Sequence, residues 1–278
     1  MRRDPKLALI GAAACFTGLV LTGIAALLWP AAQVRDAAAL DGLVALNRGG
    51  LAALLNGIAH LANPEPYAVF TIGLILIALA RGRRRLAVAL PVVLVGAEVT
   101  TELLKPLLAT ERTAGFLQER IGDASWPSGH ATAALAVALC AVLVAPRRLR
   151  PAVAFLGALF AAAVAYSILI LAWHFPSDVL GGYFVATTWV LGAVAALLAL
   201  ERRRPERSRR APWTGPPVLW PIELGVGFAL GAVGMIALWR PEQAGRFAVA
   251  HTSGVAMLAV IVALALALAG GVARTVQR

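Results

Sequence analysis

Charged residues and cysteines are scarce in this chain of 278 residues. Only 14% of the residues are charged while 60% are hydrophobic, which excludes an ordinary soluble protein. The two cysteines, Cys15 and Cys140, each lie within an apolar run, and we interpret them as small packing residues rather than a disulfide or a metal site. Cysteine ligands and a second histidine–carboxylate cluster are absent beside His130 and His174, so we expect no metal and no cofactor.

What the sequence has instead is a series of long apolar runs. A membrane-spanning helix needs about 20 apolar residues to cross roughly 30 Å of hydrocarbon. Charged segments separate eight candidate spans, at residues 7–29, 66–80, 86–104, 130–145, 152–173, 176–200, 219–239 and 247–271. We therefore predict an all-α, polytopic membrane protein with a six-helix core and two extra C-terminal transmembrane helices.

Residues 35–65 separate the first run from the second. They contain two apolar stretches, 40–46 and 51–61, which are too short and too interrupted to cross a bilayer. We predict that these stretches form an interfacial or half-inserted helix pair.

Basic residues outnumber acidic ones, and the net charge is +11. They occur in short clusters between the apolar runs, a pattern typical of membrane orientation that argues against a nucleic-acid partner. If successive spans alternate in direction, one side of the membrane receives the clusters at 2–6, 81–85, 147–150, 202–210 and 274–278. We assign that side to the cytoplasm, and so predict a multi-pass protein of the cell membrane with both termini cytoplasmic.

A segment rich in arginine and proline marks the clearest boundary in the chain. It divides the sequence into a six-helix membrane domain at 1–202, a basic linker at 203–218 and an accessory two-helix membrane hairpin at 219–278. All the motifs described below lie in the first of these parts.

The motif Pro127-Ser128-Gly129-His130 stands at the start of the fourth span. Serine is a favoured N-cap, glycine lets an anion approach the backbone, and a helix N-terminus offers unpaired amides and a favourable dipole. Ser128 and Gly129 therefore predict a phosphate-binding turn, and His130 is suited to protonating a leaving group. Taken alone, the motif also fits a simple helix cap followed by an interfacial histidine.

His174 ends the fifth span, and Asp178 falls in the first turn of the sixth, which Pro176 opens. A carboxylate that binds one ring nitrogen fixes the tautomer and leaves the other nitrogen free to attack phosphorus. We predict that Asp178 orients and His174 attacks. The alternative is a helix-capping aspartate beside a packed histidine.

Two cations precede these motifs, Lys105 at the end of the third span and Arg112 seven residues later. A point charge and a planar guanidinium suit a phosphate, although such side chains also anchor helices at a membrane surface. Glu98 and Glu102 lie within or near the same span, where charge is costly and often functional. Either glutamate is within reach of Lys105 along the helix.

The loops after the third and fifth spans emerge on the same side, so the predicted topology brings the motifs together. The residues expected on that outer, periplasmic or extracellular face are Lys105, Arg112, Ser128, Gly129, His130, His174 and Asp178. His60 and His251 have no partner at a useful spacing, and we interpret them as packed or interfacial histidines.

This arrangement resembles the type 2 phosphatidic acid phosphatase superfamily, whose pattern is Lys-x6-Arg-Pro, then Pro-Ser-Gly-His, then Ser-Arg-x5-His-x3-Asp. Here Thr113 replaces the proline of the first motif, the second motif is complete, and the third retains Ser167, His174 and Asp178. Ile168 occupies the position of the second arginine of the family. The likeness covers the segment 40–200.

The resemblance implies a metal-independent lipid phosphatase with a six-helix core. By this resemblance His174 would form a phosphohistidine, Asp178 would orient it and His130 would protonate the leaving group. The phosphate would be bound by Lys105, Arg112, Ser128 and Gly129. We expect hydrolysis of a lipid phosphomonoester or pyrophosphate, of the polyprenyl phosphate or phospholipid type, with the lipid substrate and the bilayer as partners.

The missing arginine matters because phosphoryl transfer depends on positioned cations. Two explanations are open: Arg120 replaces it from the loop between the third and fourth spans, or the substrate geometry makes it unnecessary. A catalytically degenerate lipid-phosphate-binding or sensing protein and a lipid transporter are the alternative functions. The retained histidines favour catalysis, since binding alone requires neither a nucleophile nor a general acid.

Overall fold

A computed structural model describes residues 5–47, 49–112, 116–204, 216–227, 235 and 241–277. Within these residues no strand occurs, and the all-α prediction is confirmed. The helices are α1 (Pro5–Leu28), α2 (Pro30–Val44), α3 (Leu51–His60), α4 (Pro64–Ala80), α5 (Arg84–Leu107), α6 (Phe116–Ile121), α7 (Gly129–Val144), the short 3-10 helix η1 (Arg147–Leu149), α8 (Arg150–Ile170), α9 (Pro176–Arg203), α11 (Pro241–Ala250) and α12 (Thr252–Gln277).

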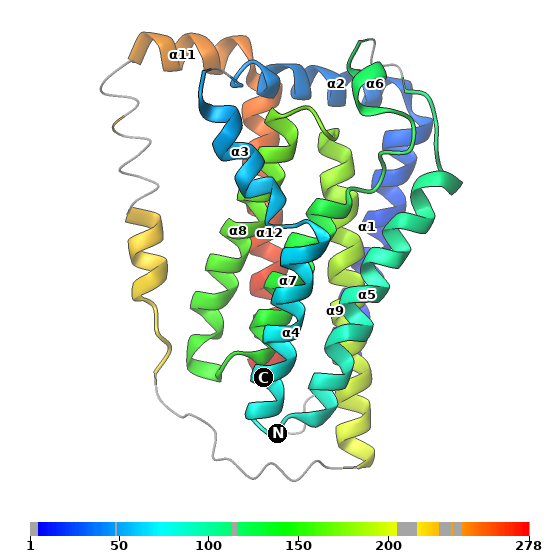
Figure 1. Cartoon of the computed structure of the whole chain (residues 1–278), viewed down its shortest axis with the longest axis vertical. Helices are drawn as coiled ribbons and strands as arrows, with labels where there is room; N and C mark the ends of the chain where they lie inside the picture. The colour runs from blue at the N-terminus through cyan, green and yellow to red at the C-terminus, as the bar shows by residue number, and fades with distance from the viewer. Residues whose placement is uncertain are drawn as a thin grey trace.

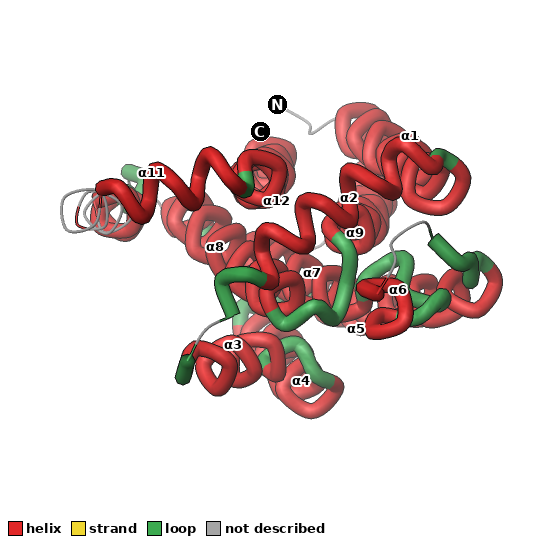
Figure 2. Tube along the Cα trace, turned by 90° about the horizontal axis from the view of Figure 1, so that it is seen from above, coloured by secondary structure: helices red, strands yellow, loops and turns green. Residues whose placement is uncertain are grey.

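Helix α7 lies at the centre of the bundle, with α8 and α9 packed along it and α4, α5 and α12 around it (Figures 1 and 2). Its residues are mostly apolar, and most of them are buried. A helix that is apolar on every side belongs in a protein interior. At 16 residues α7 is shorter than the candidate membrane spans, and its burial means that protein rather than lipid surrounds most of it.

The outer helices present apolar side chains to their surroundings, including Ile10 on α1, Ile72 on α4 and Val92 on α5. Four single helices, α1, α5, α9 and α12, and the segment Arg147–Ile170 are long and apolar enough to cross a membrane. Helices α3 and α4 are long and apolar enough only as a pair, with a bend of 48° between them, which fits either a broken span or a re-entrant loop. Exposed apolar surface on this scale suits a bilayer, and the prediction of a polytopic membrane protein is confirmed.

The last predicted span differs from the structure. The chain does not form one helix over 247–271, because α11 ends at Ala250 and α12 begins at Thr252. Glu242 and Arg246 make α11 amphipathic, and α11 lies across the end of the bundle (Figure 1). The seventh predicted span, 219–239, lies largely outside the described residues and stays a prediction.

Helix α2 also lies across this end of the bundle, and α3 then returns alongside α8 (Figure 1). The buried side of α2 is formed by residues three or four apart, among them Gln33, Asp36, Leu40 and Leu43. The two short helices predicted within 35–65 are therefore present. The first begins at Pro30, earlier than predicted.

Helix α12 packs against α8, α2 and α7. Ile261, Ala265 and Ala269 are fully buried or nearly so, and they belong to the same apolar core as the central helices. The last helix thus shares the core of the bundle. The division of the chain at 202 and 218 stays a prediction, and residues 205–215 lie outside the described part.

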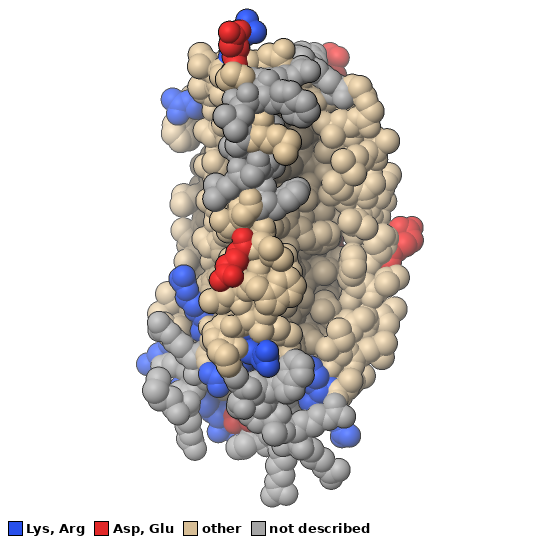
Figure 3. Space-filling model, turned by 90° about the vertical axis from the view of Figure 1, so that its left-hand side faces the viewer, with Lys and Arg blue, Asp and Glu red and all other residues tan. Residues whose placement is uncertain are grey.

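Basic side chains collect at the other end of the bundle, which we call the basic end (residues 81–85, 147–150, 201–204 and 274) (Figure 3). There Arg150 donates to the carbonyl oxygen of Val276 at 2.6 Å, and Arg85 pairs with Glu201 at 3.2 Å. These contacts join α8 to α12 and α5 to α9. Both chain termini lie at the basic end (Figure 1), and the opposite end, crossed by α2 and α11, is the site end.

Candidate active site

A backbone hydrogen bond joins the N-terminal turns of α7 and α9. The backbone N–H of Ser128 donates to the carbonyl oxygen of Asp178 at 2.9 Å. Gly182 permits this approach, because a Cβ atom there would lie 2.6 Å from the Ser128 carbonyl oxygen and 2.9 Å from Oγ1 of Thr132. Two adjacent helix N-termini concentrate unpaired N–H groups and the positive ends of two dipoles, which suits an anion.

The first turn of α7 has the predicted cap. Oγ of Ser128 accepts a hydrogen bond from the N–H of Ala131 at 3.3 Å. Gly129 faces the end of α5, since a Cβ atom there would lie 3.4 Å from Oε1 of Glu102 and 3.5 Å from Nζ of Lys105. Lys105 itself donates to Glu102 at 2.5 Å. The structure therefore brings Lys105 to the turn predicted to bind phosphate and selects Glu102 as its partner.

Asp178 contacts His174 as the spacing predicted. Nδ1 of His174 lies 3.3 Å from Oδ2 of Asp178, which leaves Nε2 free of this carboxylate. The same oxygen accepts the N–H of Phe175 at 3.0 Å, so Asp178 also caps α9. From the sequence, capping of a helix and orientation of His174 were alternative roles for Asp178. In the structure the Asp178 carboxylate has the geometry for both.

Arg112 lies behind this carboxylate. Its side chain is buried, with 2% exposed, and Nη2 donates to Oδ1 of Asp178 at 2.6 Å and to Oγ of Ser125 at 3.2 Å. Nη1 is 3.4 Å from Oγ of Ser177 and 3.8 Å from Oδ2 of Asp36. Buried ion pairs with this geometry hold both partners in place. Arg112 thus contacts Asp178, the predicted orienting residue, and its direct contact with phosphate stays a prediction.

His130 stands across from His174, with their ring centres 6.4 Å apart. Nε2 of His130 lies 3.1 Å from Oδ1 of Asn63, a distance at which a ring N–H donates to the amide oxygen. The ring of Trp173 lies 5.5 Å from that of His130 and 6.1 Å from that of His60. His60 therefore packs against an aromatic ring, as its lack of a sequence partner indicated.

Ile168 is fully buried in the apolar core at the end of α8. Another guanidinium lies near this segment, because Nη2 of Arg120 on α6 is 3.4 Å from the carbonyl oxygen of Leu171. Leu171 is three residues before His174. The structure brings Arg120 to the turn that carries the second histidine.

Asn63, Asp36 and Ser177 contact the predicted site residues but were not predicted from the sequence. The sequence offered a signal for Asp36, because this carboxylate lies on the buried face of α2, four residues before Leu40. Asn63 precedes the proline that begins α4, which predicts only a helix start. Its contact with His130 joins residues 67 positions apart, and no local pattern indicates such a pairing.

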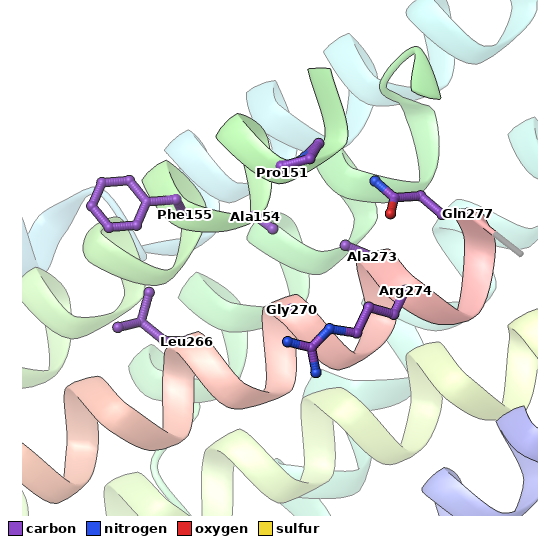
Figure 4. Close-up of a pocket in the computed structure, with 8 residues that line it drawn as sticks. All are labelled: Pro151, Ala154, Phe155, Leu266, Gly270, Ala273, Arg274 and Gln277. Atoms are coloured by element: carbon purple, nitrogen blue, oxygen red, sulfur yellow. The ribbon is translucent and has the colours of Figure 1, made fainter. Parts of the chain in front are cut away.

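Among the described residues, no group of three or more His, Cys, Asp and Glu side chains is arranged to hold a metal ion. A groove of about 310 Å³ runs between α8 and α12, lined by Pro151, Ala154, Phe155, Leu266, Gly270, Ala273, Arg274 and Gln277 (Figure 4). It lies toward the basic end and includes none of the motif residues. The groove is therefore separate from the candidate site.

Comparison with known proteins gives a family and a fold. Residues 67–204 match the PAP2 superfamily. The chain is similar to the crystal structure of the first transmembrane PAP2 type phosphatidylglycerolphosphate phosphatase from Bacillus subtilis, with a TM-score of 0.52, 20% sequence identity, and coverage of 72% of this chain and 99% of that one. At this identity the likeness shows the fold alone. No curated protein matches the chain.

Proposed function

We propose that this chain, which residues 67–204 place in the PAP2 superfamily, hydrolyses a phosphomonoester or pyrophosphate on a membrane lipid. The observation that carries the proposal is the pair of histidines at two neighbouring helix N-termini, with ring centres 6.4 Å apart. Asp178 contacts only one ring nitrogen of His174. An anion-binding turn requires neither histidine, whereas a nucleophile and a general acid account for both.

In the proposed reaction, Nε2 of His174 attacks phosphorus and the bond from phosphorus to the leaving oxygen breaks. His130 transfers a proton to that oxygen, so an alcohol or a lipid monophosphate departs and a phosphohistidine remains. His130 then removes a proton from water, whose oxygen attacks phosphorus and breaks the phosphorus–nitrogen bond. Inorganic phosphate leaves, and both histidines return to their starting states.

The phosphate is proposed to bind between Lys105 and the first turn of α7. Support comes from Gly129, whose backbone faces Nζ of Lys105, and from Ser128, which caps the helix. Arg112 is proposed to stabilise the ionised form of Asp178 in addition to the phosphate contact that the family pattern implies. The Asn63 contact holds the His130 ring and leaves Nδ1 for the leaving group.

The site is proposed to face the periplasm or cell exterior. Basic clusters at the opposite end of the bundle support this orientation, because loops rich in Lys and Arg are retained in the cytoplasm. Polyprenyl phosphates and phospholipid head-group phosphates are the proposed substrates. Both present a phosphate at the membrane surface, where the motifs are expected.

Phosphate release tests the proposal directly. Detergent-purified protein is incubated with polyprenyl and glycerolipid monophosphates and pyrophosphates, in EDTA and without added metal. We expect turnover by the wild type and a loss of about 10³-fold or more in His174→Ala. His251→Ala serves as the control, because His251 packs near Phe247 and is separate from the proposed site. Acid-labile labelling of the protein by radioactive substrate should disappear with His174.

A lipid-phosphate-binding protein is the second candidate, and one observation favours it. The cations are already engaged by protein carboxylates, Arg112 by Asp178 and Lys105 by Glu102, while Ile168 supplies no charge. Saturable binding of a lipid phosphate without release of phosphate, unchanged in His174→Ala, would select this function. Metal-independent flux of lipid into sealed vesicles would select a transporter.

A further inference from the structure

Asp36 is an acidic residue buried at the junction of α2 with the site, with 8% of the residue exposed. It belongs to α2, outside the segment 67–204 that matches the family. Oδ1 accepts the backbone N–H of Ser177 at 3.0 Å, and Oδ2 accepts its hydroxyl at 2.5 Å. A carboxylate from α2 therefore binds one of the unpaired N–H groups in the first turn of α9.

The same carboxylate reaches the centre of the site. Oδ2 of Asp36 is 3.8 Å from Nη1 of Arg112, while Nη2 of that guanidinium donates to Asp178. Arg112 thus lies between two buried carboxylates, one on α2 and one on α9. Nη1 also contacts Ser177, so Asp36, Ser177 and Arg112 form a closed set of contacts behind Asp178.

These contacts fix the positions of two groups that the proposed reaction requires. One is the guanidinium that fixes Oδ1 of Asp178, and the other is the turn of α9 that follows His174. Misplacement of a reacting group by about 1 Å is enough to cost on the order of 100-fold in rate. Asp36 makes no contact with His130 or His174 among the described contacts, so it acts through other residues.

We propose that Asp36 is a positioning residue of the hydrolytic site, which holds Arg112 and the first turn of α9 so that Asp178 stays aligned with His174. The inference rests on the proposed function. It makes α2, the helix across the site end, a part of the catalytic apparatus. It also predicts that removal of this carboxylate changes kcat more than KM, because Asp36 acts mainly on the alignment of Asp178 with His174.

The test compares Asp36→Ala and Asp36→Asn with Asp41→Ala, in purified full-length protein. Asp41 is an exposed aspartate on the same helix and supplies the matched control. We expect kcat to fall about 10- to 100-fold in Asp36→Ala with KM within about 3-fold. Asp36→Asn should recover most of kcat, since its amide oxygen still accepts from Ser177. Asp41→Ala should match the wild type.

A double-mutant cycle with Ser177→Ala tests the route of the effect. If Asp36 acts through Ser177, the loss in Asp36→Ala/Ser177→Ala is clearly smaller than the product of the two single losses. Ser177→Ala also provides the test if Asp36→Ala does not fold, and it should lower kcat without raising KM. Unchanged kcat in Ser177→Ala together with a strictly multiplicative cycle, or with Asp36→Ala unfolded, would overturn the proposal.

Orthovanadate separates this inference from the proposed function. It forms five-coordinate adducts that mimic a phosphoryl group under attack, and its binding is read from the melting temperature without any substrate. We expect an affinity at least about 10-fold weaker in Asp36→Ala than in Asp41→Ala. If the wild type releases no phosphate, the hydrolytic proposal fails. The orthovanadate affinities of the variants then still test the positioning role of Asp36. A lower melting temperature in Asp36→Ala with unchanged kcat or unchanged orthovanadate affinity would show a purely structural role and overturn the inference.

Discussion

At the residue scale, the site holds few cations for the negative charge that it must accommodate. Arg112 lies between Asp36 and Asp178, and Lys105 pairs with Glu102. A bound phosphate adds further negative charge in a partly dehydrated position, where each cation has a large effect. Any additional cation near the histidines therefore has consequences for catalysis.

Arg120 is the additional cation that the structure brings to this region. Its guanidinium donates to the carbonyl oxygen of Leu171, close in sequence to His174. We expect Arg120→Ala to lower kcat/KM about 10- to 100-fold and Arg120→Lys to retain part of the activity. Phosphate release measures the effect, with Arg246→Ala as control because Arg246 is an exposed arginine on α11. Equal activity of the two alanine variants would mean that hydrolysis proceeds without a second arginine.

Asp36 gives a prediction about pH and stability. Its pKa is raised from 3.8 to about 7, because burial and the charge of Asp178 raise the pKa more than the hydrogen bonds from Ser177 and the charge of Arg112 lower it. Between these values the folded state keeps a proton that the unfolded state has released. The free energy of unfolding should therefore fall as the pH rises from about 4 to about 7.

Melting temperatures in detergent at pH 5 and pH 8 test this prediction. The wild type and Asp41→Asn should lose more stability between the two values than Asp36→Asn, which has no proton to release. His174 faces Asp178, so the comparison is repeated in a His174→Ala background. The same pH dependence in all variants would contradict a raised pKa for Asp36.

At the scale of elements, the site is formed where helices begin. Helices α7 and α9 bring their N-terminal turns together, Lys105 in the last turn of α5 lies beside them, and α2 crosses behind. The bend between α3 and α4 positions Asn63 against His130. Two of these contributors, α2 and the α3–α4 junction, precede the segment that matches the family.

The contact between α7 and α9 requires glycine at one position. A methyl group at Gly182 would meet the Ser128 carbonyl oxygen at 2.6 Å, and backbone atoms cannot turn aside. We expect Gly182→Ala to lower the free energy of unfolding by about 1–3 kcal/mol and to separate the two turns, with loss of phosphate release.

Gly192→Ala on the same helix is the matched control. No atom lies within 4 Å of a Cβ atom at Gly192, so alanine there should be neutral or stabilising by up to about 1 kcal/mol. Thermal unfolding and phosphate release are measured for both variants. Similar behaviour of the two would show that close approach of α7 and α9 is not required.

At the scale of the whole molecule, charge divides the bundle into two different ends. The basic end carries both termini and arginines that join α5 to α9 and α8 to α12. The site end carries the motifs, with α2 and α11 lying across it. Loops rich in Lys and Arg are usually retained in the cytoplasm, so we expect the basic end to face the cytoplasm and the site end to face the opposite side.

Cysteine labelling tests this orientation in cells. After replacement of Cys15 and Cys140 by alanine, single cysteines are introduced as Glu119→Cys on α6 and Arg203→Cys at the end of α9, both exposed positions. A membrane-impermeant maleimide should label the first in intact cells and the second only after permeabilisation. The reverse pattern would place the site in the cytoplasm.

Much of the fold follows from local sequence. Apolar runs of sufficient length predict spans, and Ser128 and Pro176 predict the starts of α7 and α9 because caps depend on neighbouring residues alone. The spacing of His174 and Asp178 predicts their contact, since four residues make about one helical turn. The break at His251 was missed, although the polar residues His251, Thr252 and Ser253 interrupt the apolar run there.

What the sequence alone determined is the class of molecule, the position of most helices, the basic end and the residues of the two histidine motifs. Only the tertiary structure decided that α12 shares the core, that Arg112 contacts Asp178, and that Asp36 and Asn63 reach the site. The physical reason is distance along the chain. Patterns of caps and periodicity report contacts within a turn or two, whereas these contacts join helices whose relative positions depend on the packing of the entire bundle.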